Sequence, residues 1–251
     1  MLEQTFNTQL PLDLEVVIPS GDIEIETADG EESRVTVDGD ERLLADVEIS
    51  QDGNRIAVTY RGKGKLGFSF GPFFGGSDLS VRATVPHGAN VKVKTASADT
   101  DVSGRLGSLD VNAVSGDVRV RGEVSGNAVL KTVSGDAQLE GVGGRVSTQT
   151  VSGDVRVSSA GGSIDTKTVS GDIRCDAVSD GDVRFSSVSG DIEIGIATGS
   201  FVDVDAGSTS GDLTSEVPLG HDPVPGEENG GRKVVVRGRT ISGDVRIFRA
   251  A

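Results

Sequence analysis

The sequence has little of several residue types, and each shortage excludes a class of protein. There is no Trp, and there are only one Cys, one Met, one Tyr and two His among 251 residues. One Cys cannot form an internal disulfide framework, and with two His it cannot complete a Cys₄ or Cys₂His₂ zinc site. Lys and Arg number 24 against 39 Asp and Glu, for a net charge of −15. The chain therefore lacks the basic surface that nucleic-acid binding needs.

Long apolar runs are absent as well. No stretch approaches the roughly 18 consecutive apolar residues of a membrane-spanning helix. Residues 1–7 have neither the basic start nor the apolar core of a secretory signal. We therefore expect a cytoplasmic protein, which would be peripheral at the inner membrane face if the basic, Phe-rich segment described below contacts lipid.

What the chain does have is glycine and small aliphatic residues. It contains 36 Gly, and its hydrophobic content of 35% comes mostly from Val, Ile, Leu and Ala. This composition favours many short strands joined by Gly turns and disfavours a helical bundle. A chain of this length can bury a core as one or two domains.

The dominant feature of the sequence is an internal repeat. The tripeptide Ser-Gly-Asp recurs at nearly constant intervals, and its regular copies begin at Ser115, Ser134, Ser152, Ser170, Ser189 and Ser210. The next copy, at Ser242, follows a longer interval, which indicates one repeat that carries an insertion over 218–231. A fixed period near 20 residues is typical of architectures in which each repeat packs on its neighbours.

Each repeat has the pattern of two short strands and two turns. Apolar and polar residues alternate after each Asp, as in Val155 and Val157, and again after a second Gly turn, as in Ile164 and Thr166. We predict an all-β fold in which residues 90–251 form a single-stranded parallel β-helix or solenoid, with two-strand coils of about 18 residues. An antiparallel stack of hairpins is the alternative. The predicted inward column is Val118, Ala137, Val155, Ile173, Ile192 and Leu213.

The repeated turn places one Asp in every coil. Stacking would align these carboxylates in a file, and like charges in register are unfavourable unless something compensates them. An Arg stands two positions after four of these Asp, for example Arg156 after Asp154, and Arg184 likewise follows Asp182 of a degenerate Asp-Gly-Asp copy; we expect these pairs to balance the file. We interpret the file as structural; a divalent-cation or carbohydrate-binding file is the alternative. Its members are Asp117, Asp136, Asp154, Asp172, Asp191, Asp212 and Asp244.

Residues 1–89 contain alternating strands without the regular period. We predict that they form an irregular β cap continuous with the solenoid. Within this cap, residues 61–76 are basic and rich in Phe. This segment either folds back as a hydrophobic plug or contacts a protein partner or a membrane surface. The residues predicted to make that contact are Arg61, Lys63, Lys65, Phe68, Phe70, Phe73 and Phe74.

No catalytic, cofactor-binding or metal-binding residue can be recognised in the sequence, and we expect no cofactor. His87 lies in a turn and His221 lies in the Pro-rich insertion, away from any recognisable nucleophile or base. Cys175 has the phase of an inward residue, so we predict a core thiol. The last repeat, from Ile241, ends almost at the chain end, and its unpaired edge would allow end-to-end self-association.

Several motifs together resemble the putative-adhesin domain family of bacteria and archaea, whose function is unknown. They are the repeated Thr-Val-Ser-Gly-Asp-Val, as at 150–155, Ser-Gly-Asp at 20–22, Val-Pro-His-Gly at 85–88 and Ser-Gly-Asp at 242–244. The match covers essentially the whole chain. The resemblance implies a right-handed β-helix-like solenoid in a cell-envelope setting, with no established catalytic residues.

We therefore expect a non-enzymatic, adhesin-like scaffold or interaction protein that acts through residues 61–76. Two alternatives belong to other classes: a structural protein that polymerises end to end, and a carbohydrate- or cation-binding solenoid. A carbohydrate-active enzyme would need paired carboxylates in a groove. Nothing in the sequence distinguishes such a pair from the repeated turn Asp.

Overall fold

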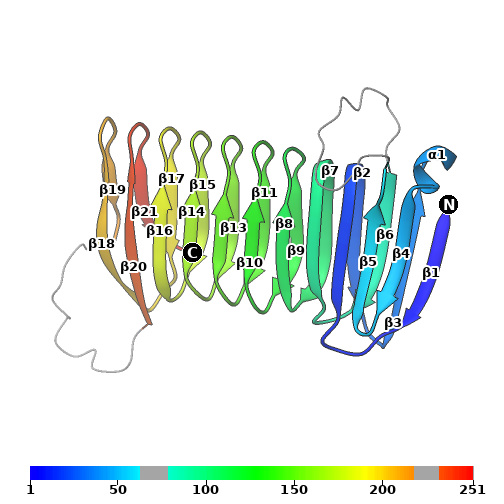
Figure 1. Ribbon diagram of the computed structural model, residues 1–251. Coiled ribbons are helices and arrows are strands. Elements are labelled where there is room, and N and C mark those ends of the chain that lie inside the picture. Colours follow the sequence, from blue (N-terminus) through cyan, green and yellow to red (C-terminus); the bar gives the residue numbers. More distant parts are fainter. Residues whose placement is uncertain (63–78, 218–231, 251) are drawn as a thin grey trace.

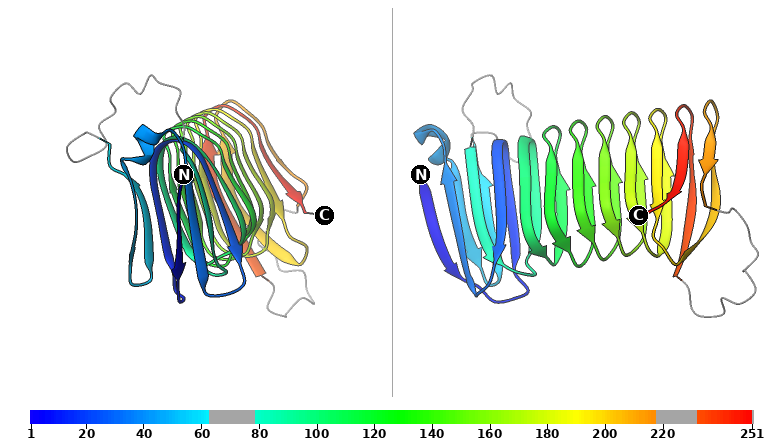
Figure 2. Two further views of the ribbon diagram at one scale, coloured as in Figure 1. Left: turned by 90° about the vertical axis from the view of Figure 1, so that its right-hand side faces the viewer. Right: turned by 180° about the vertical axis from the view of Figure 1, so that it is seen from behind.

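The computed structural model describes residues 1–62, 79–217 and 232–250. Apart from the short helix α1 (Glu41–Leu44), the described elements are strands, and they form one sheet wound around a single axis (Figure 1, Figure 2). The predicted all-β solenoid is confirmed. A sheet wound on itself suits this composition because small Val, Ile, Ala and Thr side chains fill a thin core between two faces.

The middle of the solenoid is regular. Strands with even numbers pair in parallel on one face from β8 to β16, and those with odd numbers pair in parallel on the other from β9 to β17. This parallel pairing excludes the antiparallel stack of hairpins. The strands are β8 (Ser108–Asn112), β9 (Val118–Val124), β10 (Ala128–Lys131), β11 (Ala137–Val142), β12 (Val146–Gln149), β13 (Val155–Ala160), β14 (Ile164–Lys167), β15 (Ile173–Val178), β16 (Gly181–Ser186) and β17 (Ile192–Ile196).

The parallel stack reaches further toward the N-terminus than residue 90. β7 (Asn90–Leu106) and β2 (Asp13–Ala28) each run through both faces and pair along their length. β2 also pairs in parallel with β5 (Arg55–Tyr60) and β6 (Leu79–Pro86). Antiparallel pairing in the described part of the chain occurs only at this end. β3 (Glu32–Asp38) pairs in this way with β1 (Leu2–Asn7) and β6, and β4 (Val47–Asp52) pairs with β5.

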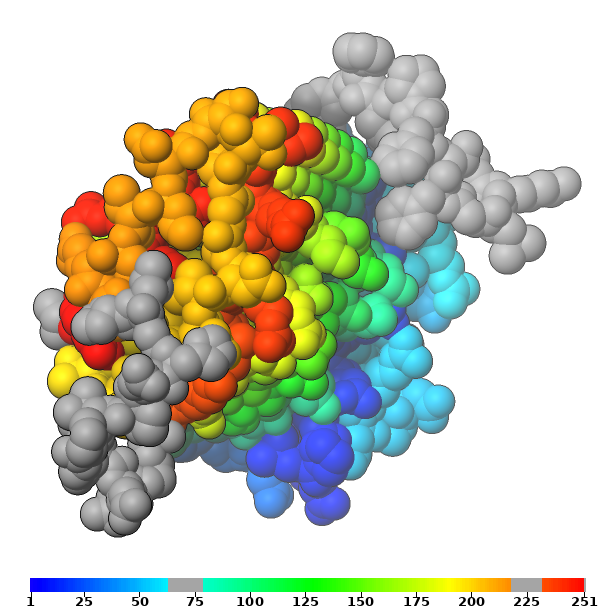
Figure 3. All heavy atoms as spheres, turned by 90° about the vertical axis from the view of Figure 1, so that its left-hand side faces the viewer, coloured from blue at the N-terminus to red at the C-terminus, as the bar shows by residue number. Residues whose placement is uncertain are grey.

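At the other end the coils are not stacked in chain order. β20 (Arg232–Thr240) pairs with both β16 and β18 (Ser200–Ser208). β21 (Val245–Arg249) likewise pairs with both β17 and β19 (Leu213–Ser215). The last coil is therefore inserted between the two coils that precede it. In Figure 3, which views this end, the orange coil of β18 and β19 lies in front of the red last coil.

This insertion corrects two predictions. The outer edge is formed by the coil at 200–215 and not by the last coil, because β20 and β21 pair with β16 and β17 on one side and with β18 and β19 on the other. Val245, and not Leu213, follows Ile192 in the inward column. Val245 is fully buried, whereas Leu213 at the outer end is 39% exposed. The other predicted members of the column are buried.

Candidate functional site

The turn Asp residues form a hydrogen-bonded ladder. The backbone N–H of each Asp donates to the Oδ1 atom of the Asp one coil earlier, at N–O distances of 2.8–3.0 Å. The ladder follows the spatial order of the coils, so Asp244 stands between Asp191 and Asp212. In each carboxylate that accepts such a bond, one oxygen is therefore already hydrogen-bonded to the turn of the next coil.

The ladder leads to a test of what the Asp side chain contributes. Asp154 accepts from the N–H of Asp172, and Asn would keep that acceptor whereas Ala would not. We expect Asp154→Ala to lower the free energy of unfolding by about 1–2 kcal/mol and Asp154→Asn by less than half as much. Urea unfolding followed by circular dichroism measures both. Equal losses for the two variants would show that the charge, and not the acceptor, matters.

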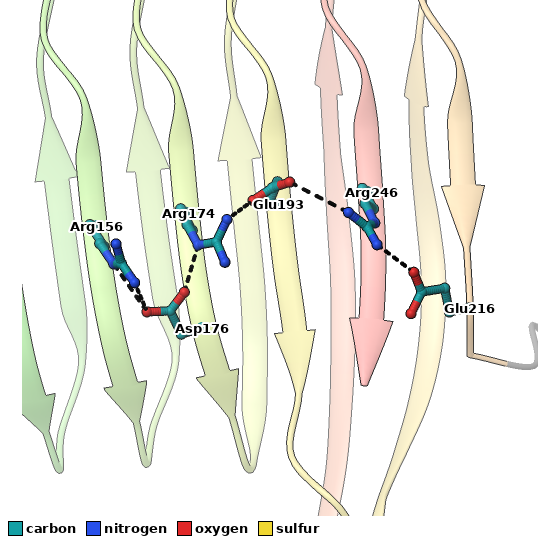
Figure 4. A network of polar contacts seen from close by, with 6 residues as sticks. All are labelled: Arg156, Arg174, Asp176, Glu193, Glu216 and Arg246. Carbon is teal, nitrogen blue, oxygen red and sulfur yellow. Dashed lines mark hydrogen bonds and ion pairs between the residues drawn. The ribbon is translucent and has the colours of Figure 1, made fainter. Parts of the chain in front are cut away.

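The predicted Asp–Arg pairs are only partly correct. Arg119 pairs with Asp117 at 2.7 Å, and Arg184 pairs with Asp182 at 3.1 Å. The expected pairs of Asp154, Asp172 and Asp244 with the Arg two positions on are wrong. The ladder bond is not the cause, because Asp117 accepts from the N–H of Asp136 and still pairs with Arg119. The other three Arg side chains instead lie over the strand face, where carboxylates of the strands are in reach. There the partners are Asp176, Glu193 and Glu216, as Figure 4 shows.

Asp176 is the most shared carboxylate of this network. It accepts from Arg156 at 2.9 Å and from Arg174 at 2.7 Å. Partial burial acts to raise the pKa of Asp176, but the hydrogen bonds from the two Arg outweigh it and leave that pKa below its ordinary value. The network therefore consists of mutually satisfied charges that fix the register of neighbouring coils, and it offers little to a ligand.

An apolar line runs along one edge of the solenoid. One Val or Ile in each of six coils lies just before the Ser-Gly-Asp turn, and these side chains are 37–55% exposed. The Ser residues from Ser134 to Ser242 pair in register from coil to coil, and the N–H of Ser134 donates to the carbonyl of Val114, so the six side chains stack in a row. A continuous exposed apolar line of this length is typical of an interaction site. We call it the ridge: Val114, Val133, Val151, Val169, Val188 and Ile241.

A shallow groove of about 420 Å³ lies beside the ridge. Val133, Val151 and Val169 of the ridge form one side. Its floor consists of small residues whose hydroxyls donate to backbone carbonyls of the turn, as Thr150 does to Ser152 at 3.3 Å. The remaining lining residues are Asn112, Ala113, Lys131, Thr132, Gln149, Lys167 and Thr168.

The opposite side of the groove is a column of polar side chains. The pairing register aligns the residue three positions before each turn Ser on successive strands. Among the described residues its three cations have no ion pair, unlike Lys94, which contacts Glu15 at 3.0 Å, and Arg237, which contacts Asp182 at 3.6 Å. We call it the polar column: Asn112, Lys131, Gln149, Lys167, Ser186 and Arg239.

Sequence reasoning missed both the ridge and the polar column, although the repeat contained a signal for each. Thr150 points inward, so the next residue, Val151, must point outward. From 112 onward the residue three before each Ser is never acidic. It is Asn, Lys, Gln, Ser or Arg in every coil except the outermost, where it is Gly207. Aligning the repeats on Ser would have shown a line without negative charge in an acidic chain.

The other predicted positions contribute less. Arg61 pairs with Glu48 at 2.8 Å. Lys63, Lys65, Phe68, Phe70, Phe73 and Phe74 lie outside the described residues. Cys175 is buried in the core as predicted, and burial raises the pKa of its thiol to about 12.

The described residues hold neither a metal-binding cluster nor a membrane-spanning helix. No group of three or more His, Cys, Asp or Glu side chains is placed there to hold a metal ion. In the same ranges no helix has the length and apolar character needed to cross a membrane.

Comparison with known proteins identifies the family to which the fold belongs. A family model described as Toastrack DUF4097 matches residues 12–248. The chain belongs to the Toastrack DUF4097 family. Toastrack proteins are β-solenoids of unknown function, and the resemblance drawn from the repeat motifs is confirmed. A search of proteins with curated functions found no match.

Two solved structures are similar over nearly their whole length. One, from Bacteroides fragilis NCTC 9343, is described as a putative adhesin; it is 11% identical, with a TM-score of 0.57 over 98% of this chain and 96% of that one. The other, from Parabacteroides distasonis ATCC 8503, is described as a putative lipid binding protein; it is 13% identical, with a TM-score of 0.50 over 98% and 96%. At these identities the likeness to the two structures concerns the fold alone.

Proposed function

We propose that the protein is a non-enzymatic, adhesin-like interaction solenoid that binds an elongated partner along the ridge and the groove. The observation that carries this proposal is the row of exposed aliphatic side chains beside a polar column whose cations have no ion pair among the described residues. Neither similar structure is described as an enzyme. An envelope-associated role fits the adhesin description of the first.

The architecture suits an elongated partner. Each coil repeats the same two surface positions at a spacing of about 4.8 Å, so a partner that follows the axis makes the same contact several times. Each contact is weak because the side chains are exposed, and affinity would come from their number. Residues 61–76 remain a second proposed contact, with a protein or a membrane surface.

End-to-end polymerisation is less well supported. The outer strand β18 carries Asp205, and the edge strand β4 at the other end carries Asp52; neither has an ion pair among the described residues. Charges of one sign on edge strands are a common device against edge-to-edge pairing. The strongly negative chain would add to that repulsion.

The proposal is tested by removing the apolar character of the ridge without changing its shape. The triple variant Val133→Thr, Val151→Thr, Val169→Thr keeps β-branched side chains at exposed positions. Immobilised protein would be exposed to a membrane and cell-wall preparation of the source organism. We expect the triple variant to retain about tenfold less material, since a loss of roughly 0.5 kcal/mol per side chain amounts to about 1.4 kcal/mol.

The matched control is Val129→Thr, a half-buried outward position on β10 that pairs with Asp110 in the neighbouring column and does not line the groove; it should retain as much as the unchanged protein. Equal retention by the triple variant would contradict the proposed function.

A further inference from the structure

The cations of the polar column have a regular spacing. Lys131 lies on β10, Lys167 on β14 and Arg239 on β20, with one strand between each pair. Adjacent strands are about 4.8 Å apart, so the positive charges recur about every 10 Å along the polar column. Lys131 and Lys167 line the groove, and Arg239 lies beyond its end in the same column. The side chains between them, Gln149 and Ser186, are neutral hydrogen-bonding groups.

This pattern describes a ligand. A ligand that fits it would carry one negative charge for every two coils. Hydroxyl or amide groups would lie between these charges, and a weakly polar side of the ligand would face the ridge. An extended disaccharide has a length close to two coils. We propose that the groove binds a linear acidic polysaccharide with one carboxylate per disaccharide. This inference rests on the proposed function, because it names the chemical class of the elongated partner.

The ridge supplies the apolar side of such a site. Sugar rings present C–H groups on their faces, and the aliphatic side chains of Val133, Val151 and Val169 can contact them. The floor remains small and level, since the Thr hydroxyls are already bonded to the turn carbonyls. A ring can therefore lie in the groove while its carboxylate reaches the polar column.

Other linear ligands fit less well. A peptide strand cannot be added to the sheet here, because the ridge carbonyls are already bonded between coils, as Val133 is to the N–H of Ser152 at 2.8 Å and Val151 to that of Ser170 at 2.8 Å. Its side chains on one face would also recur about every 6.7 Å, out of step with the coils. Single-stranded nucleic acid would find no aromatic side chain on which to stack among the described residues that line the groove.

The Asp ladder adds selectivity. Asp136, Asp154 and Asp172 follow the ridge by three positions, across the turn from the groove. A polymer with densely spaced negative charges would be repelled by this file, whereas one with widely spaced carboxylates can place each of them at a cation. Repulsion of the wrong ligand is a common source of specificity.

The spacing also predicts a length dependence. Each exposed Lys–carboxylate contact contributes little, roughly 0.2–1 kcal/mol. Three cations match three carboxylates, so affinity should rise from a disaccharide to a hexasaccharide and change little in longer chains. Because the cations are exposed, binding should weaken as salt is added.

The test uses hyaluronan oligosaccharides, which carry one carboxylate per disaccharide, with binding followed by calorimetry at low salt. We expect the hexasaccharide to bind, and the double variant Lys131→Gln, Lys167→Gln to bind it about tenfold more weakly. Lys92→Gln, in the neighbouring column, is the matched control and should bind normally. Neutral chitohexaose should bind at least tenfold more weakly, and a heparin hexasaccharide should bind no tighter.

The inference is overturned if the hyaluronan hexasaccharide does not bind, if its binding is unchanged by the double variant, or if poly-glutamate or anionic lipid vesicles bind tighter in the same assay. Its failure is distinguishable from failure of the proposed function. If the ridge variant still loses the retained material while no acidic oligosaccharide binds, the contact surface stands and only the glycan assignment falls.

Discussion

Gly153→Ala is expected to unfold the middle of the solenoid. Gly153 has φ +130°, and a Cβ atom there would lie 2.2 Å from the carbonyl oxygen of Gly135. That oxygen belongs to the turn of the preceding coil and cannot move away, since the stacked turns are held by the ladder on one side and the ridge carbonyl bonds on the other. The positive φ alone costs about 1–3 kcal/mol, and the backbone contact adds to it.

We therefore expect a loss of at least about 3 kcal/mol in the free energy of unfolding, measured by urea denaturation. Gly30→Ala is the matched control. Gly30 has φ +114°, but a Cβ atom there would have nothing within 4 Å. The control thus reports the cost of the backbone conformation without the close approach of a carbonyl oxygen. If Gly153→Ala lowered the free energy of unfolding no more than Gly30→Ala does, the tight stacking of the turns would be contradicted.

Ending the chain at residue 231 is expected to destroy two coils and not one. In a solenoid stacked in chain order, removing the last coil would leave the others paired. Here β18 pairs only with β20 and β19 only with β21 among the described strands, so the coil at 200–215 would lose its partners. Buried residues of the coil beneath, such as Phe185 and Ile194, would become exposed.

Hydrogen exchange measured by mass spectrometry follows this directly. Amide protection over 200–208 should fall at least about a hundredfold in the shortened chain, while protection over 118–160 should stay as it is in the full chain. Retained protection over 200–208 would mean that this coil can pack on the coil of β16 and β17 without the inserted one.

The sequence was sufficient to predict the structure of a single coil, but it was not sufficient to predict the order in which the coils stack. The period of the Ser-Gly-Asp turn and the alternation after it predict two strands per coil and the inward side chains, because both depend on local geometry. The place of the last coil depends on which exposed edge it meets. Every coil presents nearly the same edge, so Val245 and Leu213 have equivalent motifs and only the folded chain distinguishes them.

The charged residues show the same limit. Asp154 and Arg156 are close in sequence, but they do not pair with each other. Asp154 accepts a hydrogen bond from the N–H of Asp172 in the next coil, and Arg156 donates to Asp176. Partners across coils follow from the register, which a list of neighbours in sequence does not contain. The ridge and the polar column could be predicted from the sequence only in part. Their positions follow from the phase of the repeat, but their exposure and the groove between them follow from the packing of the turns.

The most direct test of the ridge and groove as the contact surface is a lysine footprint of the unchanged protein. Acetylation rates would be compared with and without the retained membrane and cell-wall material, residue by residue, by mass spectrometry. The account predicts that Lys131 and Lys167 are protected while Lys92 and Lys233 react as before. Protection elsewhere on the solenoid, with Lys131 and Lys167 unaffected, would contradict it.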